Sequence, residues 1–294
     1  MITNNAKAVI YTGIAVLSWS TVATAFKIAL KYLSHFEMLL VASFTALAIL
    51  ALSLTVQHKW KQVVSLKRNQ WVYFSLLGLL NPVAYYLLLF KAYDLLPAQV
   101  AQPVNYIWPI LLLILLALFA GQPIPVKKYI GMFVSLSGVV CISMGAGSDD
   151  VSFSLLGFSL ALGSALLWAV YWMINNKYKD VADTTVALFM TFLFGCIYLS
   201  AGAVVVGCDL HSWPGVLSGM YVGGFEMGIP FICFGLAIRK TSNPALINQM
   251  CYLAPFFSLF FISAILHEQI VWTTYVGLCL IVAGILFNQY LVKE

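Results

Sequence analysis

Apolar residues fill ten long runs of the chain, and short polar stretches separate them. The runs cover residues 8–30, 36–56, 71–90, 97–120, 126–145, 154–174, 184–207, 213–236, 244–266 and 271–291. Each comes close to the roughly 20 apolar residues that a helix needs to cross a hydrocarbon core about 30 Å thick. Because the connections are too short to form a soluble domain, the pattern predicts an all-α polytopic membrane protein with ten transmembrane helices.

Composition and charge support this prediction. Hydrophobic residues make up 62% of the chain and charged residues 9%, far from the roughly 25% charged residues of soluble domains. With both termini in the cytoplasm, twelve of the fifteen Lys and Arg residues fall on the cytoplasmic side, and the exceptions are Lys27, Lys31 and Lys91. Positive loops orient membrane proteins in this way. We expect a multi-pass protein of the bacterial inner (plasma) membrane, a lipid partner and no nucleic acid.

The chain repeats itself after 146 residues, because this shift places Tyr106 on Tyr252 and Pro109 on Pro255. We expect two five-helix repeats, residues 8–145 and 154–292. An odd number of spans makes the second repeat enter the membrane inverted, which is typical of secondary transporters with a site near the midplane. Paired glycines seven residues apart also match: Gly131 and Gly138 with Gly277 and Gly284. We interpret them as packing positions, between the repeats or in a homodimer.

Amides and phenols recur on matching faces of the two copies. In the run 97–120, Gln102 and Tyr106 lie one turn apart, and Asn248 and Tyr252 take the corresponding positions in the second copy. Such side chains either line a cavity or hydrogen-bond neighbouring helices. We favour cavity lining.

Aromatic side chains also lie at mid-membrane depth rather than at the interface, where tryptophan belts form. Asn81 and Tyr85 share one face of the third run, Trp19 and Trp168 lie at equivalent depths, and Tyr171 follows Trp168 by one turn. They either pack the core or line a cavity for a planar or cationic solute, which aromatic rings bind by stacking and cation–π contact.

Glu226 is an acid near the centre of the run 213–236. An acid at that depth is costly and is expected to face the bundle interior and mark a pathway. Lys27 and Lys91 lie near the ends of their helices, where we expect them to reach for the interface. Three roles for Glu226 stay open: proton coupling, pairing with a substrate ammonium, and structural hydrogen bonding.

The six cysteines are interpreted as core residues within the spans, because no C-x-x-C pair and no histidine at ligand spacing accompany them. The chain also lacks the G-x-x-x-x-G-K-[ST] and H-E-x-x-H patterns of nucleotide-driven and zinc enzymes. We therefore expect no metal, no cofactor and no enzymatic activity, although a membrane enzyme or scaffold is the competing non-transport interpretation.

Four segments together resemble a known family. They are LSWST at 17–21, VNYIWP at 104–109, LLWAVY at 166–171 and NNKY at 175–178. The chain resembles the EamA-type drug/metabolite transporters, and within them the aromatic amino acid exporters. The resemblance implies two inverted five-helix repeats around a central cavity, with alternating access, as a monomer or homodimer.

It also implies export of amino acids or related small metabolites. Glu226 departs from the apolar or small residues expected there in the aromatic amino acid exporters. That departure keeps a second interpretation open, an importer or exchanger of a cationic metabolite of quaternary amine, nucleoside or purine type.

Overall fold

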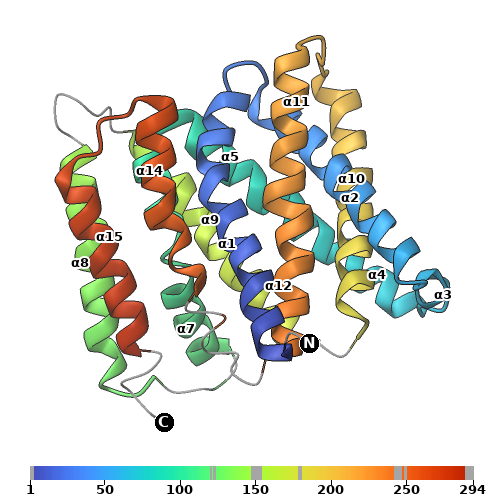
Figure 1. The fold of residues 1–294 in the computed structure, drawn as a ribbon, viewed down its shortest axis with the longest axis horizontal. Helices are drawn as coiled ribbons and strands as arrows, with labels where there is room; N and C mark the ends of the chain where they lie inside the picture. The colour runs from blue at the N-terminus through green and yellow to red at the C-terminus, as the bar shows by residue number, and fades with distance from the viewer. Residues whose placement is uncertain are drawn as a thin grey trace.

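The structure is a bundle of helices. The computed structural model describes residues 3–119, 121, 124–146, 154–177, 181–241, 247 and 250–288. In chain order its helices are α1 (Asn4–Ala29), α2 (His35–Val56), α3 (Trp60–Val64), α4 (Arg68–Gly78), η1 (Leu79–Ala84), α5 (Tyr85–Leu95), α6 (Ala98–Asn105), α7 (Trp108–Phe119), α8 (Lys128–Ala146), α9 (Leu155–Lys177), α10 (Thr184–Val206), α11 (Trp213–Val222), η2 (Gly223–Gly228), α12 (Ile229–Lys240), α14 (Ala254–Leu266) and α15 (Trp272–Leu286). Helix α1 begins and α15 ends at the same end of the bundle (Figure 1).

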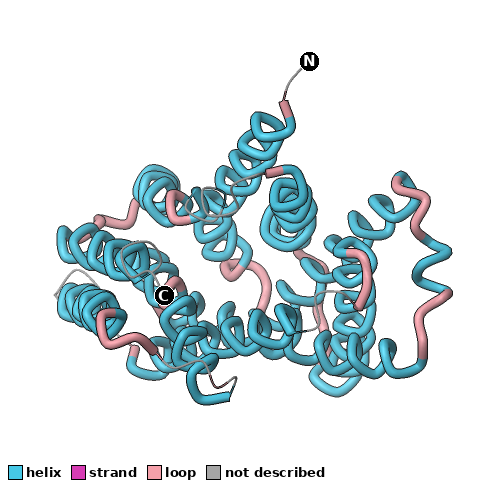
Figure 2. The backbone as a smooth tube through the Cα atoms, turned by 90° about the horizontal axis from the view of Figure 1, so that it is seen from below, coloured by secondary structure: helices cyan, strands magenta, loops and turns pink. Residues whose placement is uncertain are grey.

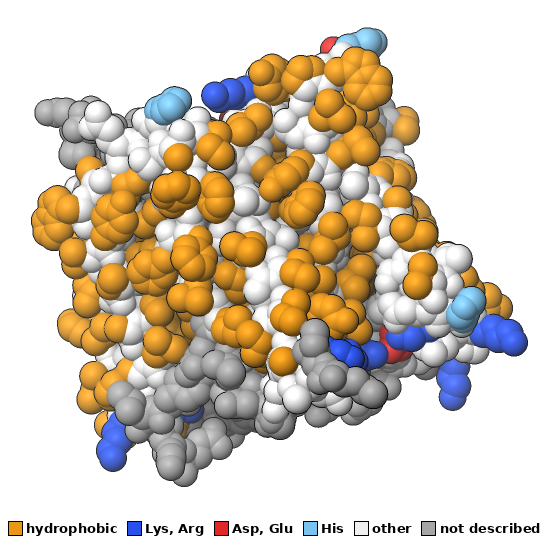
Figure 3. Space-filling model, in the orientation of Figure 1, with side chains coloured by type: hydrophobic (Ala, Val, Ile, Leu, Met, Phe, Trp, Pro, Cys, Tyr) orange, Lys and Arg blue, Asp and Glu red, His pale blue; other side chains and the backbone are white. Residues whose placement is uncertain are grey.

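Seven helices within the described ranges are long and apolar enough to cross a membrane. They are Asn4–Ala29, His35–Val56, Arg68–Leu95, Ala98–Phe119, Leu155–Asn175, Thr184–Val206 and Trp213–Lys240. Three shorter apolar helices cover Lys128–Ile142, Ala254–Leu266 and Trp272–Leu286. Hydrophobic side chains cover the middle of the face in Figure 3, and Lys and Arg side chains lie toward its upper and lower edges. The protein is therefore an all-helical multi-pass membrane protein, and the count of ten full-length spans stays a prediction.

Two long helices are interrupted where proline and glycine weaken the helical ladder. Helices α4 and α5 are joined by the π-helical segment η1, in which Asn81 has φ −143° and ψ 118° and precedes Pro82. Helices α11 and α12 are joined by the π-helical segment η2, which is followed by Pro230. Proline has no N–H to donate and its ring disturbs the preceding turn, so breaks of this kind have a local cause. They bring irregular backbone into the interior of the bundle.

The run expected at 97–120 is two helices instead of one. Helix α6 ends at Asn105 and α7 begins at Trp108. Pro109 lies at the start of α7, where its missing N–H costs no helical hydrogen bond. Tyr106 thus lies in the turn between the two helices.

Helices α8 and α15 pair tightly, and each belongs to a different copy of the repeat. A Cβ atom at Gly138 would lie 2.5 Å from the carbonyl oxygen of Gly277, and the Ser135 hydroxyl donates to the Ile281 carbonyl at 3.1 Å. Missing side chains let the two backbones approach, which confirms packing between the copies. Figure 2 shows α3 and this pair at opposite sides of the bundle.

The cysteines correct one expectation. Cys208 lies in the connection after α10, where it is exposed, and not within a span. Cys279 is also exposed, on α15. The expectation that all six are core residues is therefore wrong, because hydrophobic neighbours in the sequence do not decide which way a side chain points.

Candidate functional site

A cavity of about 790 Å³ lies inside the bundle, with side chains of α1, α5, α6, α9 and α12 in its lining. This volume is within the range of small-molecule sites. Eight of the side chains predicted from the sequence line it: Trp19, Tyr85, Gln102, Tyr106, Trp168, Tyr171, Glu226 and Tyr252. The cavity therefore gathers residues from both copies of the repeat.

Glu226 is half-buried and lies in η2. Tyr86, which is fully buried on α5, donates its hydroxyl to Oε1 of Glu226 at 3.1 Å. Oε2 has no hydrogen-bond partner among the described residues, and it is not fully buried. Tyr86 thus binds one carboxylate oxygen, and the other faces the cavity that Glu226 lines.

Trp19 secures the backbone at the same place. Its indole N–H donates to the main-chain carbonyl of Glu226 at 3.2 Å. In an α-helix that carbonyl would accept from Pro230, which has no N–H. A side chain from the first copy therefore satisfies a backbone group in the second copy.

Stacked aromatic rings form one wall of the cavity. Trp168 on α9 stacks on Tyr85 at 4.7 Å between ring centroids, on Tyr171 at 5.3 Å and on Phe231 at 6.1 Å. Trp19 approaches Phe231 at 6.3 Å in an edge-on arrangement. Offset and edge-on pairs of this kind stabilise each other, and these rings belong to the lining of the cavity.

Polar residues beneath this wall hold α5, α6 and α9 in register. The Tyr85 hydroxyl donates to Oδ1 of Asn105 at 3.4 Å, and Nδ2 of Asn105 donates to the Ser164 hydroxyl at 2.8 Å. Gln102, on the same helix as Asn105, is only 4% exposed, and its buried Oε1 has no hydrogen-bond partner among the described residues. Because a buried acceptor without a donor is costly, this oxygen is suited to a donor on a bound solute.

One predicted site residue, Asn81, lies outside the lining of the cavity. Asn81 is completely buried beside Tyr171, and it does not contribute to the lining of the cavity. The break at η1 places it apart from Tyr85, with which it was expected to share a helix face. Asn248 lies outside the described residues.

At the end of the bundle that carries Lys27, polar contacts link the turn between α5 and α6 to α1 and to the connection before α15. The ammonium of Lys27 donates to the carbonyls of Tyr93 at 2.9 Å and Leu96 at 3.0 Å. The Glu268 carboxylate accepts from the backbone N–H groups of Ala98 at 3.2 Å and Gln99 at 3.4 Å. A cation thus meets the C-terminus of α5 and an anion meets the N-terminus of α6, as the helix dipoles favour.

Gln99 adds three hydrogen bonds between α6 and the region at the start of α15. Its Nε2 donates to the Gln269 carbonyl at 2.9 Å, and its Oε1 accepts from the Val271 N–H at 3.1 Å and the Thr274 hydroxyl at 3.2 Å. We call these contacts of Lys27, Gln99 and Glu268 the Lys27-end latch. The ammonium of Lys27 binds carbonyls at the end of α5, and the expectation that it reaches the membrane interface stays a prediction.

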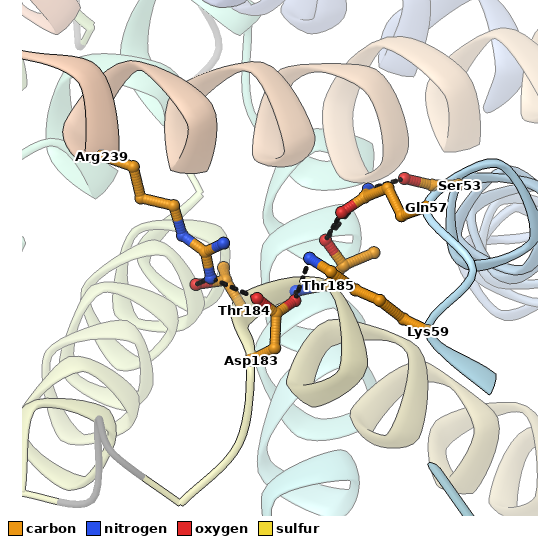
Figure 4. A network of polar contacts seen from close by, with 7 residues as sticks. All are labelled: Ser53, Gln57, Lys59, Asp183, Thr184, Thr185 and Arg239. Atoms are coloured by element: carbon orange, nitrogen blue, oxygen red, sulfur yellow. Dashed lines mark hydrogen bonds and ion pairs between the residues drawn. The ribbon is translucent and has the colours of Figure 1, made fainter. Parts of the chain in front are cut away.

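The opposite end of the cavity carries an ionic network (Figure 4). Asp183 accepts from the Lys59 ammonium at 2.8 Å, from the Arg239 guanidinium at 2.7 Å and from the Thr185 N–H at 2.9 Å. Burial alone would raise the pKa of Asp183, but the hydrogen bonds from Lys59 and Arg239 outweigh it and lower that pKa from 3.8 to about 2. Arg239 and Lys128 line the cavity at this end.

Sequence reasoning missed several residues of the site. Tyr86, Asn105 and Phe231 are ordinary members of apolar runs, although Asn105 is part of the VNYIWP segment. An asparagine next to a tyrosine on a predicted cavity helix was a signal for Asn105. The role of Tyr86 had no such signal, because it depends on a contact with a residue 140 positions away.

Comparison with known proteins identifies the family that this chain resembles. The sequence profile of the EamA-like transporter family matches the chain twice, at residues 6–144 and 155–290. An uncharacterized transporter of Bacillus subtilis, YvbV, is 24% identical over 74% of this chain and 72% of its own length. The aromatic amino acid exporter YddG of Ancylobacter novellus is 24% identical over 64% of each chain, and that of Salmonella typhimurium is 23% identical over 62% of this chain and 63% of its own.

A solved crystal structure shares the fold along nearly the whole chain. It aligns with a TM-score of 0.67 at 21% identity and covers 97% of this chain and 96% of its own. The relatives are transporters by name. Because the family's description matches almost every residue from 6 to 290, this chain belongs to the EamA-like transporter family and is a transporter, not an enzyme.

Proposed function

We propose that this protein is a secondary transporter that moves amine-bearing small metabolites, amino acids and their relatives, out of the cytoplasm by alternating access. One observation carries the proposal: a carboxylate inside an aromatic cavity, with Oε1 of Glu226 held by Tyr86 and the other oxygen facing the cavity. An acid at this depth costs on the order of 2.5 to 3.5 kcal/mol on insertion scales. A bound ammonium offsets that cost, and the rings of Trp168 and Trp19 hold the apolar part of the solute.

Alternating access is supported by the arrangement of the two copies. We propose that residues 8–145 and 154–292 are inverted five-helix repeats that move around the cavity. The cavity reaches Arg239, and the Lys27-end latch closes the other end. With the Arg239 end in the cytoplasm, as the excess of basic residues favours, this conformation would load solute from inside. The naming of two relatives as aromatic amino acid exporters supports the same direction.

The test uses purified protein in liposomes, with counterflow measured against amino acids, purines and amines. We expect the wild-type protein to exchange amine-bearing solutes and Glu226→Gln to weaken their binding by about 2 to 5 kcal/mol, the range for removing one partner of a buried charge pair. Asp94→Asn is the matched control, because Asp94 is exposed and pairs with Lys91 on the same helix. Normal binding and exchange by Glu226→Gln, together with an unchanged response to a pH gradient, would contradict the proposal.

The same variant separates pairing from proton coupling. If Glu226 carries a proton, Glu226→Gln will still bind and exchange solute but will lose the response to a pH gradient. If Glu226 pairs with an ammonium, solute binding itself will weaken. Import or exchange of a cationic metabolite would appear as net uptake from the Lys27 side.

A further inference from the structure

The cavity has an uneven distribution of charge. Among the described residues that line it, the acidic and basic side chains are Glu226, Lys128 and Arg239. Both bases lie at one end of the cavity, Lys128 at the start of α8 and Arg239 near the end of α12. The acid and the bases therefore do not form one compact site for a dipolar solute.

Arg239 is too distant to join Glu226. It follows Glu226 by thirteen residues in η2 and α12, roughly 20 Å at 1.5 Å per residue. Its guanidinium is also engaged, by Asp183 at 2.7 Å and by the Thr184 hydroxyl at 2.9 Å. Lys27 is held in the latch at the opposite end.

This arrangement of charges favours the binding of amines over the binding of amino acids. In an α-amino acid, a single carbon atom joins the ammonium and the carboxylate. If the ammonium binds Glu226, the carboxylate must lie near the Glu226 carboxylate, where like charges in a medium of low dielectric constant repel. Apart from Lys128 and Arg239, the donors that the described lining offers it are neutral phenols, indoles, amides and a hydroxyl, whereas burying an unpaired charge is strongly unfavourable.

The uncharged lining points to a cation as well. The unpaired Oε1 of Gln102 is an acceptor, and it suits an N–H of the solute. Trp168, Tyr85 and Phe231 form an aromatic wall of the cavity. Ring faces attract cations, more strongly when water is excluded. Two buried donors of the lining have no hydrogen-bond partner among the described residues, the indole N–H of Trp172 and Nδ2 of Asn288, and both are neutral.

From these observations we infer that the cavity selects monocations: amines that carry a flat apolar group and no free carboxylate, in preference to zwitterionic α-amino acids. This inference rests on the proposed function and narrows its substrate class. An amine produced by decarboxylation, or an amino acid whose carboxyl group is masked as an amide, has the required charge. Glu226 is then the residue that determines specificity.

Phenylalanine amide and phenylalanine test the inference, because they share ring and ammonium and differ in the carboxyl charge. Binding is measured in detergent by quenching of tryptophan fluorescence, since Trp19, Trp108, Trp168 and Trp172 line the cavity. Exchange is measured by counterflow of labelled phenethylamine in liposomes, with protein-free liposomes as background. We expect the amide and phenethylamine to bind at least about tenfold more tightly than phenylalanine, and Glu226→Gln to abolish most of this difference.

The outcomes separate the inference from the proposed function. Phenylalanine that binds and exchanges as well as its amide overturns the charge selection and leaves the transport function standing. Amines that bind selectively without any exchange overturn the transport proposal and support the selection. A wild-type protein that neither binds nor exchanges any of the three compounds overturns both. Asp94→Asn must keep the selectivity, since a loss there would also contradict the role of Glu226.

Discussion

The Lys27-end latch offers a direct test of how this end of the cavity stays closed. Glu268→Gln removes a negative charge at the N-terminus of α6 and keeps one oxygen acceptor of similar reach. Glu268 accepts from Ala98 N at 3.2 Å and from Gln99 N at 3.4 Å, so both bonds are long. A charge at a partly buried helix terminus stabilises it by up to about 2 kcal/mol. Because the bonds are long, we expect a loss of about 1 to 2 kcal/mol from the closed conformation.

That loss corresponds to a shift of about 5- to 30-fold in the ratio of open to closed molecules, since about 1.4 kcal/mol is a factor of ten. The native Cys251 thiol lines the cavity and reports on opening. In liposomes, in a variant in which Cys208 is replaced by Ser, a membrane-impermeant maleimide applied from the Lys27 side is expected to label Cys251 faster in Glu268→Gln by that factor. The rate of labelling is proportional to the open population when opening is fast.

Asp94→Asn is again the matched control. Asp94 carries a negative charge at the same end, but it pairs with Lys91 on its own helix and does not link two helices. An unchanged labelling rate in Glu268→Gln would refute the reasoning. An equal increase in Asp94→Asn would also refute it, since a general change in surface charge would then be the cause. A lower melting temperature in detergent would indicate unfolding instead of opening, so thermal stability must be measured alongside.

Three further predictions follow from other parts of the structure. The pKa of Asp183 is lowered from 3.8 to about 2, so its pairing stabilises the folded state above about pH 4, and this contribution is lost as the pH falls toward 2. Asp183→Asn is expected to lower the thermal unfolding temperature in detergent at pH 7, and the difference from wild type is expected to shrink between about pH 4 and about pH 2. Gly138→Leu is expected to destabilise the protein by about 1 to 3 kcal/mol through overpacking against a backbone oxygen of α15, whereas Gly13→Ala, where a Cβ meets nothing within 4 Å, is expected to leave the unfolding temperature unchanged. In intact right-side-out cells, native Cys208 is expected to react with an impermeant thiol reagent, whereas cysteines introduced at Gln62 and Lys127 are expected to react only after permeabilisation; labelling of these two from outside would contradict the orientation proposed from the basic residues.

The sequence by itself determined the helical membrane architecture. In a bilayer every backbone N–H and C=O must be paired within the protein, so long apolar runs have little choice but to be helices. The repeat placed Gly138 and Gly277 at equivalent positions, and the small size of glycine made a close helix contact predictable. The depth of Glu226 followed from counting residues along its run. These properties depend on local periodicity and on the thickness of the membrane, and both can be evaluated without knowing which helices are neighbours.

Only the tertiary structure decided which polar groups meet. Asn81 and Tyr85 were predicted on one helix face, but the break at η1 ends the regular rotation of 100° per residue on which that prediction depends. Tyr86, the neighbour of Tyr85 in the chain, is the residue that reaches Glu226. Lys27 binds the carbonyls that end α5, because the fold brings them within reach of its ammonium. Such contacts join residues far apart in the chain, and their geometry is set by helix packing and helix breaks, which hydrophobic periodicity alone does not encode.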